Sequence, residues 1–292
     1  MPAATTLAAH THRPEARLTD SNREPNEVRC VLGLAVTSPA EVVLQVAAAG
    51  PDQLVLEELF SASLDGELIP YEELPGAAGG RQHVLRADPG KLLVVYDAKV
   101  ARAPVGDAQV VSLRDRVDAL RPSRYCPSDR LSGFAGSRFG QEPTALDKVR
   151  AICAYVNRHI RYVSGSSIGT TDAVDTLVSG QGVCRDFAHL VAALCRAVDV
   201  PARVTGVYAP GLMPMDLHAV VETDIDGRWQ VWDATRLAPR PALVRIATGR
   251  DAADTAFATV LSGHAELTTL QVLAVAGGRL PTDDHVGLVT LD

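Results

Sequence analysis

A glycine-rich turn leads directly into an apolar helical pattern near the middle of the chain, and this junction constrains the fold more than any other feature. Residues 179–183 read Ser-Gly-Gln-Gly-Val, and from Phe187 to Val198 apolar side chains recur every three or four residues. Cys184 falls in the first turn of the predicted helix, where free backbone N–H groups and the helix dipole stabilise a thiolate. The helix must therefore bury one face and present a reactive sulfur at its start.

A β-hairpin is predicted downstream of this helix. Residues 216–222 and 228–233 read as two strands, and the dipeptide Asp226-Gly227 between them is typical of a two-residue turn. With this turn at the centre, His218 and Asp233 lie on the same face of the hairpin as diagonal neighbours. Their backbones are then about 7–8 Å apart, a distance that two side chains can bridge.

A cysteine nucleophile needs two further groups, and the hairpin supplies candidates for both. One is a base that takes the thiol proton, and the other holds that base in the right tautomer. His218 can serve as the first and Asp233 as the second. His189 is a rival base, but it lies five positions after Cys184, about 140° around the helix, and points away from the sulfur. We interpret His189 as a hydrogen-bonded packing residue.

Three blocks, in this order, resemble the transglutaminase-like superfamily in its bacterial cysteine-protease-like branch: residues 182–190, 216–219 and 232–235. The resemblance implies a papain-like core in which Cys184 is the nucleophile, His218 the general base and Asp233 the orienting carboxylate. It covers roughly residues 145–240, and residues 248–254 are similar to a later segment of the branch. Ala234 departs from the proline that the family commonly has there, without removing a catalytic atom.

A nucleophile of this kind attacks an amide carbonyl and forms a thioester, which water or an amine then resolves. We expect hydrolysis of a peptide or protein substrate, as by a cysteine protease or amidase, because a transferase must protect its thioester from water and the sequence contains no recognisable amine site. Acyl transfer to an amine is one alternative. The other is a non-catalytic module that binds peptides or assembles with a partner.

The oxyanion that develops during attack needs hydrogen-bond donors. We expect the backbone N–H of Cys184 to be one of them, because it lies at the start of a helix. A second donor is not identified by the sequence, although Gln181 or a residue before it is a candidate. A metal site is not expected, since the chain contains no CxxC or HxxxH motif and no acidic calcium loop. We therefore predict no cofactor.

Composition restricts the remaining possibilities. The chain has 292 residues, 47% of them hydrophobic, which is enough for a sizeable core and two domains. A net charge of −7 argues against a nucleic-acid partner. No apolar run approaches the ~20 residues of a membrane span, and the first residues lack the pattern of a secretion signal. We expect a cytoplasmic protein without a membrane partner; the sequence specifies no oligomeric state.

The cysteines agree with this location. Five of them, an odd number without a CxxC pair, lie mostly in apolar periodic stretches and are expected to be reduced thiols: Cys30, Cys126, Cys153, Cys184 and Cys195. Cys195 follows Cys184 by eleven positions, about three helical turns, so the two cannot form a disulfide within the helix.

The chain divides into five parts, and the fold class is α+β. Helical patterns, capped at Thr144, precede the hairpin strands, whereas the residues from Val28 onward alternate like antiparallel strands. The predicted parts are a mobile arm (1–27), an antiparallel β-sandwich domain (28–105), a linker (106–143), the transglutaminase-like catalytic core (144–240) and a C-terminal extension that completes the core (241–292).

Overall fold

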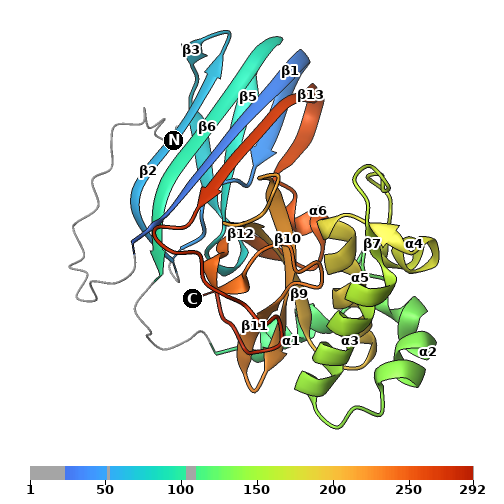
Figure 1. Ribbon diagram of the computed structural model, residues 1–292. Helices are drawn as coiled ribbons and strands as arrows, with labels where there is room; N and C mark the ends of the chain where they lie inside the picture. Colours follow the sequence, from blue (N-terminus) through green and yellow to red (C-terminus); the bar gives the residue numbers. More distant parts are fainter. Residues whose placement is uncertain (1–23, 51–52, 103–109, 292) are drawn as a thin grey trace.

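The computed structural model describes residues 24–50, 53–102 and 110–291 and has the expected α+β architecture (Figure 1). Most of the predicted arm, residues 1–27, lies outside the described residues. Two antiparallel sheets organise the chain, one of seven strands and one of four, and a two-stranded parallel pair adds a third small sheet. Within the described residues, no helix has the length and apolarity that crossing a lipid bilayer requires.

The seven-stranded sheet forms the N-terminal domain, and its strand order is β3-β2-β6-β1-β5-β4, with β13 paired to β1. The strands are β1 (Asn26–Leu44), β2 (Gln53–Leu64), β3 (Glu67–Leu68), β4 (Tyr71–Pro75), β5 (Arg81–Ala87), β6 (Gly90–Arg102) and β13 (Ala258–Val275). The turn between β2 and β3 has Gly66 at a positive φ of 95°, as expected from the Asp-Gly dipeptide there. The antiparallel β-domain predicted from the sequence is confirmed.

One long strand curls this sheet. The first part of β1 pairs with β6, its last part pairs with β5, and β13 follows it along nearly its whole length. The pairing with β13 shifts register on both sides of Ser38, next to Pro39, which cannot donate a ladder hydrogen bond. Gly263 faces this bend, where an added Cβ would lie 2.0 Å from the Pro39 carbonyl oxygen. The curled sheet packs around an apolar core, to which Tyr208, Val244 and Ile246 of the four-stranded sheet also contribute.

The four-stranded sheet has the order β11-β10-β9-β12 and carries the predicted hairpin. Its strands are β9 (Ala202–Tyr208), β10 (Leu217–Ile225), β11 (Arg228–Trp232) and β12 (Val244–Gly249). Ile225 pairs with Arg228 across the Asp226-Gly227 turn, and both turn residues have positive φ. The predicted register of the hairpin is therefore confirmed.

Helices cover this sheet, as Figure 1 shows. They are α1 (Leu113–Leu120), α2 (Ser128–Phe139), α3 (Ala145–His159), α4 (Ala173–Ser179), α5 (Cys184–Ala197) and α6 (Ala252–Thr255), with short 3₁₀ turns η1 (Ala77–Gly79) and η2 (Arg240–Ala242). The parallel pair is β7 (Arg161–Tyr162) and β8 (Gln181–Gly182). Thr144 caps α3 by accepting a hydrogen bond from the Asp147 N–H, as the sequence predicted.

The central helix is α5, which packs against α2, α3 and α4 and against the strands β9 and β10. The sequence predicted one buried face, but every residue from Asp186 to Arg196 is buried. A helix enclosed by other elements must be apolar around most of its circumference. Burial of Leu190 and Leu194, both fully inaccessible, stabilises the fold by about 1.5–3 kcal/mol each.

The predicted linker, residues 106–143, contains two helices in its described part. Ser112 and Asp115 form a capping box at the start of α1, and α2 packs on α5. The prolines and glycines of this stretch favoured a linker, but Leu131, Ala135 and Phe139 recur at four-residue spacing and are buried. Their helical periodicity outweighs the glycine content, because the buried face of α2 supplies the packing energy.

The C-terminal residues 241–292 were expected to complete the core, and the structure divides their described part between the two domains. β12 joins the four-stranded sheet, whereas β13 pairs with β1 in the N-terminal sheet. The chain then returns, since the Val231 N–H donates to the Val289 carbonyl at 2.8 Å. The chain that follows the β10–β11 hairpin therefore connects the two domains. Figure 1 shows β13 running beside β1.

Candidate active site

Cys184 is the first residue of α5, and the elements before it fix this position. Gly180 ends α4 in the left-handed conformation, with φ 65°. Gly182 follows in β8, where an added Cβ would lie 2.7 Å from the Cβ of Asp186. This close approach lets the Asp186 carboxylate accept a hydrogen bond from the Val183 N–H at 2.8 Å. The sharp entry into the helix therefore depends on glycine at both positions.

A charged pair secures the same turn. The carboxylate of Asp186 is fully buried and forms an ion pair with Arg185 at 3.1 Å. The guanidinium of Arg185 also donates to the Ser167 hydroxyl and to the Ile168 carbonyl. Arg185 thereby ties the loop that follows β7 to the start of α5. The Cys184 side chain stays partly accessible, whereas the other four cysteines are buried.

The structure brings His218 and Asp233 together as the hairpin parity predicted. The Nε2 atom of His218 lies 3.0 Å from Oδ2 of Asp233, and both side chains are 1% exposed. The second carboxylate oxygen of Asp233 accepts from the N–H of Thr235 at 2.9 Å and from its hydroxyl at 2.7 Å. Asp233 is thus held on both oxygens and orients the imidazole ring.

Burial and charge act in opposite directions on this pair. Burial would lower the pKa of His218, but the adjacent Asp233 carboxylate and its hydrogen bond raise the pKa to about 10. Burial would raise the pKa of Asp233, but His218 and the two donors of Thr235 lower it. The pair is therefore an imidazolium next to a carboxylate at neutral pH.

The other ring nitrogen of His218 is the one available to the cysteine. Nδ1 is buried and forms no hydrogen bond with the described residues. The Cys184 thiol contributes to the raised pKa of His218, so the sulfur is a neighbour of the ring. Because Asp233 occupies Nε2, Nδ1 is the ring nitrogen left to face the sulfur.

Tyr162 is a site residue that the sequence analysis missed. It lies in β7, paired in parallel with Gly182 of β8, and its ring centroid is 6.0 Å from that of Phe187 in the first turn of α5. Burial raises the pKa of its phenol to about 12, and both the thiol and the backbone N–H of Cys184 act on it. The phenol therefore lies beside Cys184. No local periodicity signals this, because β7 has only two residues.

His189 has the packing role that the sequence predicted. Its ring is fully buried, stacks on Tyr125 with centroids 5.2 Å apart, and accepts a hydrogen bond at Nε2 from the Ala252 N–H at 3.1 Å. Burial lowers its pKa to about 4. Asp251 completes this contact by accepting from the Tyr125 N–H. The stretch 248–254 thus packs against α5 and its surroundings.

The remaining thiols are ordinary core groups, and burial raises the pKa of Cys30, Cys126 and Cys153 to about 12. Among the residues that the structure describes, no group of three or more His, Cys, Asp or Glu side chains is arranged to hold a metal ion.

Comparison with known proteins assigns the family. The profile of the transglutaminase-like superfamily matches residues 134–234. A solved protein from Cytophaga hutchinsonii, described as a proposed cysteine protease, is 35% identical, covers 90% of this chain and 94% of its own, and superposes with a TM-score of 0.80. This chain belongs to the transglutaminase-like superfamily. Its helices and four-stranded sheet are the papain-like transglutaminase core, and its N-terminal sheet has a counterpart in that relative.

A curated relative is more distant. The uncharacterized protein ML0607 of Mycobacterium leprae (strain TN) is 27% identical over 137 residues, which is 47% of this chain and 48% of that protein. The chain thus matches about half the length of this curated relative. The family assignment rests on the Cytophaga hutchinsonii protein, whose match spans both domains.

Proposed function

We propose that this protein is a cysteine hydrolase of the transglutaminase-like superfamily that cleaves amide bonds in peptide or protein substrates. The observation that carries the proposal is the 3.0 Å contact between His218 and Asp233, opposite a cysteine at the start of α5. The solved relative from Cytophaga hutchinsonii, described as a proposed cysteine protease, supports the same class of enzyme. We assign the chemistry to the predicted core, residues 144–240.

The first half-reaction begins from an ion pair. Because the pKa of His218 is raised to about 10, its ring is protonated at neutral pH and favours the thiolate of Cys184. The sulfur attacks the carbonyl carbon, and a carbon–sulfur bond forms as the carbonyl π electrons move to oxygen. When the tetrahedral intermediate collapses, the carbon–nitrogen bond breaks. His218 gives its Nδ1 proton to the leaving amine, and a thioester remains.

The second half-reaction restores the enzyme. Neutral His218 takes a proton from water, whose oxygen attacks the thioester carbon. The carbon–sulfur bond then breaks, the acid product leaves, and the sulfur returns as the thiolate paired with the imidazolium. Asp233 holds the ring through Nε2 in both halves, so that Nδ1 always points to the reaction.

The oxyanion is stabilised by two donors in this proposal. The backbone N–H of Cys184 is the first, and the phenol of Tyr162 is the second. The support for Tyr162 is its parallel pairing with Gly182 and the action of both the Cys184 N–H and the thiol on its phenol. Gln181, the candidate from the sequence, pairs through its backbone with Arg161 in the same small sheet.

Hydrolysis is favoured over acyl transfer because the site is open to water. The Tyr162 side chain, beside the sulfur, is 46% exposed, and a thioester in such a place is accessible to solvent.

The five cysteines are all free thiols, which fits a reducing compartment such as the cytoplasm.

A labelling experiment tests the nucleophile. We expect a thiol-directed, amide-like electrophile to label the wild-type protein at Cys184, and the Cys184→Ala variant to remain unlabelled with an unchanged circular dichroism spectrum. Cys153→Ala is the matched control, since Cys153 is buried in the core, and should be labelled like the wild type. Equal labelling of the Cys184→Ala variant would remove Cys184 from its proposed role.

A product experiment tests the reaction. The protein is incubated with a panel of glutamine-containing peptides, with and without a primary amine, and the mass changes are followed. Cleavage or deamidation that depends on Cys184 supports hydrolysis. Amine incorporation that outruns both would assign the protein to acyl transfer instead, and no Cys184-dependent change would favour the non-catalytic binding module.

A further inference from the structure

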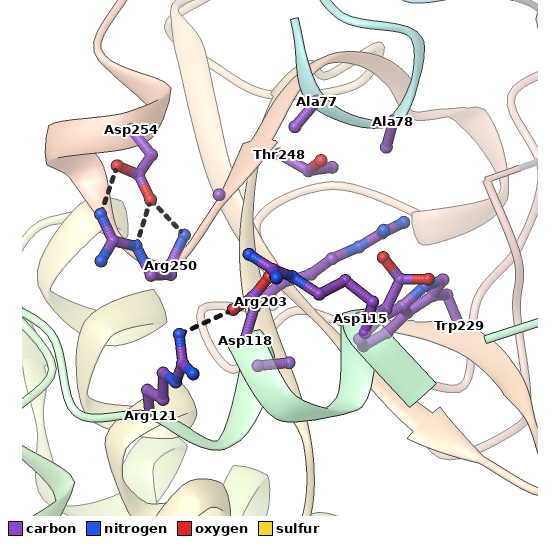
Figure 2. A pocket seen from close by; sticks show the side chains of 13 residues that line it. Ala77, Ala78, Asp115, Asp118, Arg121, Arg203, Trp229, Thr248, Arg250 and Asp254 are labelled. Carbon is purple, nitrogen blue, oxygen red and sulfur yellow. Dashed lines mark hydrogen bonds and ion pairs between the residues drawn. The ribbon is translucent and has the colours of Figure 1, made fainter. Parts of the chain in front are cut away.

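A cavity lined by described residues lies away from Cys184, His218 and Asp233. It has a volume of about 400 Å³ and lies between η1 of the N-terminal domain, α1, α6 and the strands β9, β11 and β12. Figure 2 shows Arg250 and Asp254 on one side of it, Trp229 on the other, and Ala77 near its upper edge. A cavity of this volume is within the usual range for small-molecule binding sites.

The buried feature of this cavity is Arg203 of β9. Its side chain is only 11% exposed, and its Nε–H donates to Glu222 at 2.9 Å. The guanidinium lies over the Trp229 ring, 4.2 Å from the centroid. Glu222 is itself fixed, because it is fully buried and accepts from the Thr205 hydroxyl at 2.8 Å. The head of Arg203 is thus held in one orientation before any ligand arrives.

The terminal nitrogens of Arg203 are left for a ligand. They make no hydrogen bond to any of the described residues, and Arg203 lines the cavity. A guanidinium whose Nε is engaged still presents N–H groups in a planar fork that matches the oxygens of a carboxylate or phosphate. Because the fork is already immobilised, little entropy is lost when an anion binds to it.

Among the side chains that line the cavity, arginines outnumber aspartates four to three. Glu222 accepts from a second arginine, on β12, besides Arg203, and Asp118 is shared by Arg114 at 2.7 Å and Arg121 at 3.1 Å. Two carboxylates therefore each face two guanidiniums. The rim arginines are exposed, so their ion pairs are weak and can rearrange around a bound group.

We propose that this cavity binds a small molecule through an oxyanion, a carboxylate or a phosphate group, held by the terminal N–H groups of Arg203. The ligand would touch both domains, since Ala77 belongs to the N-terminal domain and Arg203 to the catalytic sheet. Glu222 lies four residues along β10 from His218, about 13 Å away. The site is therefore separate from the catalytic groups, and its binding test does not depend on the proposed function.

Trp229 provides the measurement. The full-length protein is titrated with inorganic phosphate and, separately, with acetate, at constant pH and ionic strength, and tryptophan fluorescence is followed. We expect a saturable change with at least one of them. Saturation with phosphate alone assigns a phosphorylated ligand, saturation with acetate alone assigns a carboxylate, and saturation with both assigns a site that accepts either group. A response that rises without saturation, or no response to either anion, overturns the proposal.

Variants localise the binding. Arg203→Lys keeps a cation beside Glu222 but removes the fork, and we expect the apparent Kd to rise about tenfold or more. Arg86→Lys is the matched control on the exposed surface of the N-terminal sheet and should bind like the wild type. Ala77→Leu fills the mouth of the cavity without touching an ion pair and should also weaken binding. If Arg203→Lys and Ala77→Leu both bind the anion with wild-type affinity, the assignment is wrong. If one variant is unstable, the affinity of the other decides.

Discussion

Two histidines close to α5 have opposite properties. His218, at the start of β10, has its pKa raised to about 10, whereas His189, within α5, has its pKa lowered to about 4. Both are almost completely buried, with 3% and 0% exposure. Burial alone disfavours the charged form of either ring, so burial does not explain the difference between them.

The partner of each ring decides its charge. His218 faces the carboxylate of Asp233 at 3.0 Å, which stabilises the imidazolium. His189 instead accepts a hydrogen bond from the Ala252 N–H at its Nε2, and only an unprotonated nitrogen can accept. One ring is therefore suited to proton transfer and the other to packing, although both are buried.

Removal of the charged ring should have the largest effect. His218→Ala should lower kcat/KM by about 10²–10⁴-fold, because the general acid and base is lost. The measurement is hydrolysis of the best substrate from the peptide panel. His189→Gln, which keeps an acceptor for the Ala252 N–H, is the matched control and should retain most of the activity. A similar loss in both variants would mean that the effect is structural.

Neutralising the carboxylate tests its orienting role. Asp233→Asn should lower the pKa of His218 and reduce kcat by about 10²–10⁴-fold, since the amide favours a different tautomer and no longer stabilises the imidazolium. The pH dependence of Cys184 alkylation is measured alongside. A pH profile identical to that of the wild type would contradict this role of Asp233.

Removal of one hydroxyl tests the second oxyanion donor. Tyr162→Phe keeps the ring contact with Phe187 but deletes the phenol oxygen. We expect kcat to fall about 10²-fold, towards the lower end for loss of one oxyanion donor, with little change in KM. Tyr125→Phe is the control, because Tyr125 stacks on His189 instead. An unchanged kcat in Tyr162→Phe would exclude the phenol as the second oxyanion donor.

The effects of the two histidines on stability depend on pH in opposite directions. For His189 the folded pKa, about 4, lies below the ordinary 6.5, so its contribution is present above pH 6.5 and is lost as pH falls towards 4. For His218 the folded pKa, about 10, lies above 6.5, so its contribution is present below pH 6.5 and is lost as pH rises towards 10. The His189 contribution is about 3 kcal/mol.

Urea unfolding at several pH values measures both effects. His83, whose pKa burial also lowers to about 4, adds to the same acid loss in every protein, so each variant is compared with the wild type at the same pH. His189→Gln should weaken the loss of stability below pH 6.5, and Asp233→Asn should weaken the loss above it. A parallel shift of the stability of both variants at all pH values would contradict the assigned pKa directions.

Several parts of the site follow from local sequence. The Asp226-Gly227 turn fixes the hairpin register, and because side chains alternate along a strand, that register places His218 with Asp233. Gly180 and Gly182 allow the sharp turn before Cys184 for conformational reasons that act within a few residues. The roles of the three side chains remain proposals, but their juxtaposition was predictable.

Contacts between distant segments could not be predicted in this way. Tyr162 reaches the nucleophile because two residues of β7 pair with two of β8, a contact too short to leave a periodic pattern. The side-chain alternation of β13 is compatible with a strand of either sheet. Only the tertiary structure shows that β13 pairs with β1. The contact of Arg203 with Trp229 likewise joins two strands of the sheet.

Local sequence was enough to predict that Cys184 lies at the start of a helix, that one turn pairs His218 with Asp233, and that the fold class is α+β. Capping, turn chemistry and side-chain periodicity act over short stretches of chain. Only the folded structure shows which histidine is charged, which phenol lies beside Cys184, and that β12 and β13 belong to different sheets. These properties depend on burial and on charges brought together from distant positions, as the opposite pKa shifts of His218 and His189 demonstrate.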